Sequence, residues 1–207
     1  MILLFDHVIS IIIAGVVFLM LITFQGNVSG TTMGRTLLYQ GKKHTLELAD
    51  VLERDLVNAG YSTAPNENGI LDHQTANLGG ADVTRMFEFW TDVAGTPARV
   101  RYELSLQEMV TLDGIEIPLF KLSRSENAGA GWVAAGGSAP TITDFDIGLR
   151  TDNNQPTVDL AAVRMLRIRL KNTIAPGIEY RGFLSGMRVL RWGIQIRPHN
   201  LRGYSDV

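Results

Sequence analysis

Residues 2–24 read ILLFDHVISIIIAGVVFLMLITF, in which only four residues are polar. The 17 residues from Val8 to Phe24 carry no charge. As a helix, residues 2–24 would reach ~34 Å, which is enough to cross the ~30 Å hydrocarbon core of a bilayer. The run is longer than the apolar part of a secretory signal peptide, and no Lys or Arg precedes it. We therefore expect residues 1–25 to form a transmembrane helix.

The segment after this run is polar and contains two glycines, Gly26 and Gly30. Each Gly in a helix costs ~1 kcal/mol relative to Ala, so we expect a kink or a non-helical joint here. Between residues 33 and 58 the apolar residues recur at spacings of three and four, which predicts an amphipathic helix. Gly60 is placed to end it. Residues 26–60 are therefore expected to be a joint followed by an amphipathic helix.

From residue 61 onward the pattern changes to strands. Alternation of polar and apolar residues, or high strand propensity, predicts strands over residues 86–90, 99–104, 115–122, 142–149, 163–170 and 187–196. The Gly- and Ala-rich stretch 127–140 is expected to be a loop. Half-apolar strands favour an antiparallel sheet with one solvated face, whose other face would bury the amphipathic helix. The predicted fold is α+β, with residues 61–207 as a β-rich globular domain.

Three stretches carry a resemblance to a known family. Residues 52–61 read LERDLVNAGY, residues 87–92 and 99–104 read FEFWTD and RVRYEL, and residues 194–201 read IQIRPHNL. In this order they resemble the end of the long helix, the first hairpin and the closing strand of type IV pilins and pseudopilins. The resemblance is closest to the minor pilins and minor pseudopilins of type IV pilus and type II secretion systems.

This resemblance implies a function in assembly. The chain would be a structural subunit, of the minor, priming or tip type, of a pilin-like filament or secretion pseudopilus, and its partners would be other pilin or pseudopilin subunits. Before assembly it would be a single-pass protein of the cell inner membrane with its C-terminal domain extracytoplasmic, and afterwards part of a cell-surface or periplasmic filament. The alternative is a membrane-anchored extracytoplasmic binding module that does not polymerise.

Asp6 is the most specific candidate residue. In the pilin family an acid at the fifth position pairs with the N-terminal amine of a neighbouring subunit, and here the acid is sixth. The resemblance therefore implies that Asp6 takes this pairing role. Alternatively, Asp6 lies at the boundary with the lipid headgroups, where a charge near the end of an apolar span can stay hydrated.

We expect no catalytic, metal or cofactor site. The chain has no Cys, and its four histidines lack metal-ligand spacing. Asp72 and His73 are adjacent, so they should point apart on a strand, and Ser185 lacks the GxSxG pattern of a nucleophile elbow. Residues 152–159 are rich in oxygen ligands, but Pro156 stands where a calcium loop needs Asp or Asn, which favours a polar turn.

Charge is distributed unevenly along the chain. Residues 160–207 have a net charge of +7, and residues 1–159 a net charge of −9. A basic region can bind nucleic acid, but the aromatic residues do not interleave with the arginines as a stacking platform requires. We favour contact with the next subunit, or cross-strand pairing of Arg167 and Arg169 with Glu88 or Glu103.

Overall fold

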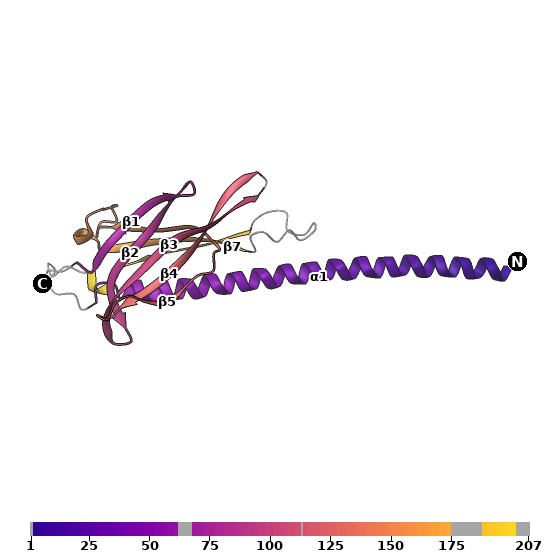
Figure 1. Cartoon of the computed structure of the whole chain (residues 1–207), viewed down its shortest axis with the longest axis horizontal. Coiled ribbons are helices and arrows are strands. Elements are labelled where there is room, and N and C mark those ends of the chain that lie inside the picture. The colour runs from indigo at the N-terminus through magenta and orange to yellow at the C-terminus, as the bar shows by residue number, and fades with distance from the viewer. Residues whose placement is uncertain (1, 62–67, 113, 175–187, 202–207) are drawn as a thin grey trace.

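The computed structural model describes residues 2–61, 68–112, 114–174 and 188–201. One α-helix, α1 (Ile2–Val57), precedes an antiparallel sheet, which confirms the expected α+β layout. Figure 1 shows α1 extending far beyond the sheet, with the N-terminus at its distant end. The described strands are β1 (Ile70–Leu78), β2 (Ala81–Val93), β3 (Thr96–Leu112), β4 (Ile115–Asn127), β5 (Val133–Gly137), β6 (Ile142–Arg150), β7 (Met165–Ile174) and β8 (Arg188–Ile196). Two 3-10 turns, η1 (Leu160–Ala162) and η2 (His199–Leu201), complete the described elements.

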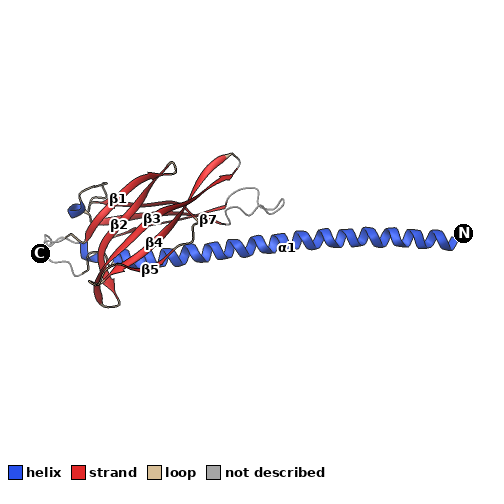
Figure 2. Ribbon diagram, in the orientation of Figure 1, coloured by secondary structure: helices blue, strands red, loops and turns tan. Residues whose placement is uncertain are grey.

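The helix is continuous, so the predicted joint at Gly26 and Gly30 is wrong. All 56 residues of α1 are α-helical, a length of ~84 Å, and Figure 2 shows no break in the ribbon. The glycine penalty is local, whereas helix propagation is cooperative and both flanks are already helical. Polar side chains in this region bond to the helix itself: the hydroxyl of Thr31 donates to the carbonyl of Asn27 at 2.9 Å.

The C-terminal end of α1 is set by Gly60, as expected. Gly60 has φ +86°, in the left-handed region that favours glycine. Its amide donates to the carbonyl of Trp90 at 2.7 Å, which ties the helix end to β2. A Cβ at this position would lie 2.9 Å from the side chain of Leu201. A larger residue would therefore clash as well as strain the backbone.

The described strands follow the order β1-β2-β3-β4-β6-β7-β8, and β5 pairs with β4. Each of the six strands predicted from sequence overlaps an observed strand, although β2, β3 and β4 extend beyond the predicted bounds by up to eight residues. Two strands were not predicted. β1 was not recognised, and β5 lies inside the stretch 127–140 that was expected to be a loop. β5 reads VAAGG and gains its strand conformation from pairing with residues 123–126 of β4.

The sheet folds over its own core. β4 meets β6 at one pair, Phe120 with Ile142, and beyond this point β2 and β6 come together. The amide of Ile147 on β6 donates to the hydroxyl of Thr84 on β2 at 2.9 Å. The C-terminal part of α1 covers this core, and Leu52 and Leu56 are fully buried. The predicted packing of the amphipathic helix on the sheet is therefore confirmed.

Candidate functional site

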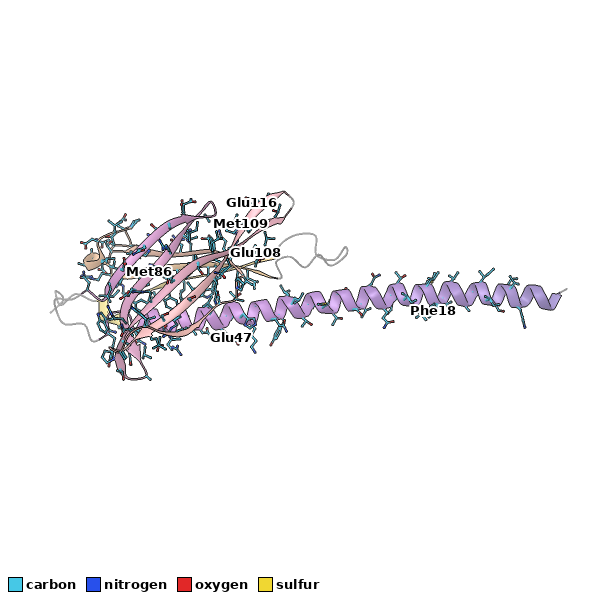
Figure 3. The ribbon with its side chains drawn as sticks, viewed as in Figure 1. Phe18, Glu47, Met86, Glu108, Met109 and Glu116 are labelled. Atoms are coloured by element: carbon cyan, nitrogen blue, oxygen red, sulfur yellow. The ribbon has the colours of Figure 1, made fainter. Side chains whose placement is uncertain are left out.

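The N-terminal half of α1 exposes an apolar surface. Thirteen large apolar side chains between Val8 and Phe24 are each 47–71% exposed. One 18-residue window of α1 has a mean hydropathy of 2.6 and none of it is buried. Figure 3 shows this half, with Phe18 labelled, well away from the sheet. The chain thus has an N-terminal helix that is long and apolar enough to span a membrane.

The residues that sequence analysis assigned to assembly lie in this helix. Asp6 is in the first two turns of α1, and its side chain is outside the part that the structure describes. Gly26, Gly30 and Gly34 follow at intervals of four, which places them on one face of the helix. A Cβ at Gly26 or Gly34 would meet nothing within 4 Å. These glycines therefore leave the helix backbone accessible to another helix.

A buried polar network fixes the other end of α1 to the sheet. Asp55 is 3% exposed, and its carboxylate accepts hydrogen bonds from Tyr102 Oη at 2.7 Å and Arg124 Nε at 2.6 Å. The backbone carbonyl of Asp55 accepts a further bond from Thr91 Oγ1 at 3.1 Å. Arg124 also pairs with Glu126. The helix is thereby joined to β2, β3 and β4 at a defined register.

The electrostatics of this network follow from burial and charge. Burial raises the pKa of Tyr102 well above its usual value, and the nearby negative charge of Asp55 raises it further. Burial alone would lower the pKa of Arg124, but the hydrogen bonds to Asp55 and Glu126 outweigh it and raise that pKa. Tyr102 therefore stays a neutral donor and Arg124 stays a cation near neutral pH. The network works as a structural clamp between the helix and the sheet.

Charged side chains pair across the strands, although not with the partners predicted. Arg169 pairs with Asp146 at 2.7 Å and Lys171 with Asp144 at 2.6 Å, both between β7 and β6. The prediction that Arg169 pairs with Glu88 or Glu103 is wrong, because β7 lies beside β6 and β8 rather than beside β2 or β3. The basic strands are thus partly neutralised by the acidic strand next to them.

Glu88 has different cationic partners, which come from β3. Arg101 binds it at 2.7 Å and Arg99 at 3.4 Å. The ring of Trp132 lies 4.1 Å from the guanidinium carbon of Arg101 and 5.3 Å from that of Arg99. Trp132 therefore stacks on two arginines. Sequence analysis did not predict this contact, because Trp132 is distant from both arginines in the sequence. Because Glu88 offsets one of the two positive charges, the cluster is a weaker attractant for a phosphate backbone than two free arginines would be.

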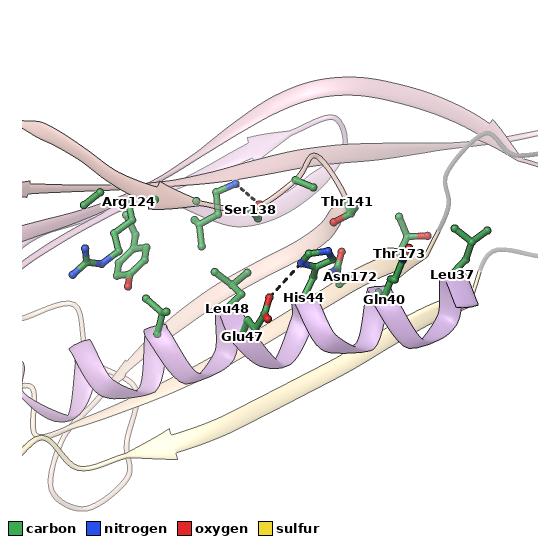
Figure 4. Close-up of a pocket in the computed structure, with 18 residues that line it drawn as sticks. Leu37, Gln40, His44, Glu47, Leu48, Arg124, Ser138, Thr141, Asn172 and Thr173 are labelled. Atoms are coloured by element: carbon green, nitrogen blue, oxygen red, sulfur yellow. Dashed lines mark hydrogen bonds and ion pairs between the residues drawn. The ribbon is translucent and has the colours of Figure 1, made fainter. Parts of the chain in front are cut away.

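A groove of about 600 Å³ lies between α1 and the sheet. Figure 4 shows its walls: α1 on one side, with Leu37, His44 and Leu48, and the segment around Ser138 on the other. Its base includes Asn172 and Thr173 of β7. Sequence analysis did not predict this groove, because it depends on how β5 is placed relative to the helix.

The remaining candidates have structural partners. His73 Nε2 lies 3.4 Å from Thr84 Oγ1, and burial lowers its pKa, while Asp72 accepts a bond from Gln74. Asp152 pairs with Arg197 at 2.8 Å, and Asp159 caps η1. Both carboxylates of the suspected calcium loop are therefore used in other contacts. Ser185 lies outside the described residues, which contain no cluster of three potential metal-ligating side chains.

Sequence analysis also missed the network around Asp55. Leu52, Asp55 and Leu56 share one helix face at spacings of three and four, so an acid stands on the buried stripe. A charge on such a stripe needs a buried partner, and that was the available signal. Its partner Arg124 is 69 residues away and could not be identified without the strand register.

No protein-family model matches the chain, and comparisons with curated proteins and with solved structures also give no match.

Proposed function

We propose that this chain is a structural subunit of a pilin-like filament or secretion pseudopilus, of the minor, priming or tip type. The observation that carries the proposal is the contrast between the two halves of α1. Thirteen large apolar side chains between Val8 and Phe24 are exposed, whereas Leu52, Asp55 and Leu56 are buried against the sheet. The second half positions the first as a rigid projecting arm, which needs either a bilayer or neighbouring helices around it.

In this proposal the membrane and the filament are successive environments of the same helix. The apolar arm holds the subunit in the inner membrane as a single span, with the sheet domain extracytoplasmic. It then packs among the corresponding helices of other subunits, where the glycines at positions 26, 30 and 34 allow close approach. The mechanism is assembly rather than catalysis. A membrane-anchored binding module that does not polymerise is the second candidate, and the groove beside α1 is the observation that favours it.

Cross-linking in intact cells separates the two candidates. The chain contains no Cys, so one introduced thiol reports one position. Phe18→Cys places the thiol on the exposed apolar arm, and Val158→Cys, at a residue 96% exposed on the sheet domain, measures random collisions. With a membrane-permeant maleimide–benzophenone, which adds to the introduced thiol and on illumination inserts into a neighbouring C–H bond, a filament subunit gives Phe18→Cys adducts with other subunits in the sheared-filament fraction. Recovery in membranes alone, with adducts no more frequent than for Val158→Cys, would contradict the filament proposal and support the anchored module.

A further inference from the structure

The groove beside α1 has an open strand edge as one wall. In the described part of the chain β5 pairs with β4 alone, and all five residues of β5 are exposed. Ala135, Gly136 and Gly137 of this strand line the groove, opposite the helix. An unpaired strand edge presents backbone donors and acceptors to any extended chain beside it. Natural edges are usually protected by Lys or Pro, and β5, which reads VAAGG, has neither.

The described residues around the groove leave it unfilled. β4 pairs with β5 over residues 123–126 and with β6 only at Phe120, so the sheet divides under α1. β5 carries only Ala and Gly side chains at its groove positions, which do not reach the helix. The resulting volume of about 600 Å³ is within the ~300–1,000 Å³ range of ligand-binding pockets. This space lies between β5 and the helix face that carries Leu37, His44 and Leu48 (Figure 4).

The base of the groove holds polar atoms without partners. Asn172 Oδ1 and Thr173 Oγ1 have no hydrogen-bond partner among the described residues, although the two residues are only 5% and 2% exposed. The amide nitrogen of Asn172 donates to Thr45 Oγ1 at 2.9 Å, which fixes the orientation of the side chain. Both residues are among those that line the groove (Figure 4). Buried groups of this kind are normally satisfied, so these two atoms indicate a missing hydrogen-bonding partner.

We propose that this groove binds an extended segment of a partner polypeptide, which pairs as an added strand with the free edge of β5. Its backbone would bond to β5, its small apolar side chains would face Leu48 and Val51, and a donor group would reach Asn172 Oδ1 and Thr173 Oγ1. Strand addition fits the groove better than an inserted helix, because one wall is itself a strand edge. The proposal concerns the monomeric chain and does not depend on whether α1 polymerises.

The test uses the full chain in lipid nanodiscs and a phage-displayed library of random nonapeptides. Ala135→Trp fills the groove, and Ala134→Trp is the matched control, since Ala134 is exposed on the same strand but does not line the groove. We expect enriched peptides without central Pro, whose affinity falls at least tenfold with Ala135→Trp and less than twofold with Ala134→Trp. No enrichment, or equal losses with the two variants, would overturn the proposal.

Two further measurements identify the binding mode. Hydrogen exchange at those amides of residues 133–137 that do not bond to β4 should be fast in the free chain and slowed at least tenfold by a bound peptide. Thr173→Val removes the unpartnered hydroxyl with little change of shape, so it should leave thermal stability unchanged or higher while weakening the peptide severalfold. Protection of these free-edge amides in the chain without peptide, or peptide binding that leaves them unprotected, would contradict strand addition.

Discussion

The buried clamp between Asp55 and Arg124 should dominate the stability of the helix–sheet junction. Asp55→Asn keeps the shape of the side chain but removes its charge, which leaves Arg124 buried with only Glu126 as an ionic partner. Removing one member of a buried pair costs ~3–5 kcal/mol. Because Glu126 remains, we expect the lower end, about 3 kcal/mol, or a fall in Tm of ~6–12 °C for a chain of this size.

The matched control is a second Asp–Arg ion pair that is more exposed to solvent. In the Asp146–Arg169 pair the side chains are 26% and 57% exposed, against 4% and 8% for Asp55 and Arg124. Exposed pairs contribute ~0–1 kcal/mol, so Asp146→Asn should change Tm by only a few degrees. Urea unfolding in detergent micelles, followed by tryptophan fluorescence, measures both variants. The three tryptophans, at positions 90, 132 and 192, all lie in the sheet domain, so the signal reports that domain and not the apolar arm.

A double variant separates loss of charge balance from loss of packing. Asp55→Asn with Arg124→Met leaves no unpaired cation in the interior, and Glu126 is exposed enough to be hydrated. The double variant should therefore be more stable than Asp55→Asn alone. The reasoning would be refuted if Asp55→Asn cost no more than Asp146→Asn, or if the effects of the two single substitutions simply added.

Three further predictions test other parts of the molecule. Asp6→Ala should leave membrane insertion intact and lower recovery in sheared filaments, with Asp6→Glu closer to wild type; equal recovery of wild type and Asp6→Ala would remove Asp6 from assembly. Burial lowers the pKa of His73 in the folded chain, whereas in the unfolded chain this histidine keeps its ordinary pKa of ~6.5. The unfolded chain therefore binds more protons as the pH falls, and the free energy of unfolding should decrease between pH 7.5 and 5.5. This decrease should be smaller in His73→Gln. If urea unfolding of the wild type and of His73→Gln depended on pH in the same way, the role of His73 would be contradicted. Gly26→Ala should leave the helix continuous but lower recovery in sheared filaments, because a Cβ at this position would keep a neighbouring helix further away; normal recovery would show that close approach at Gly26 is not needed.

The regular elements could be predicted because their patterns are local. The strand at residues 99–104 alternates, and Val100, Tyr102 and Leu104 are buried while Arg99 and Arg101 are not. The end of α1 was predictable for a similar reason, since Gly60 has the positive φ that its position suggested. The pilin resemblance implied the same layout, and the α+β arrangement agrees with it at that coarse level.

The features that sequence analysis missed depend on distant parts of the chain. β5 has no alternation of its own and becomes a strand only because β4 is beside it. The break expected at Gly26 was judged from local propensity, which cooperative extension of a long helix overrides. The ion pair of Arg169 with Asp146 and the clamp of Asp55 with Arg124 required the strand order, which composition does not encode.

The relative size of two energies explains why one charge can decide the environment of α1. Burying the thirteen exposed apolar side chains stabilises the helix by on the order of 20 kcal/mol, at ~1.5 kcal/mol or more per side chain. This term is nearly the same whether lipid tails or neighbouring helices cover them, so it keeps the arm out of water without choosing between the two. An acid near the helix end changes the free energy of the helix by only a few kcal/mol. This contribution, however, differs between a hydrated headgroup region and a dry helix bundle. Since only differences shift an equilibrium, the transfer of α1 from membrane to filament that we propose should depend more on Asp6 than on the apolar surface.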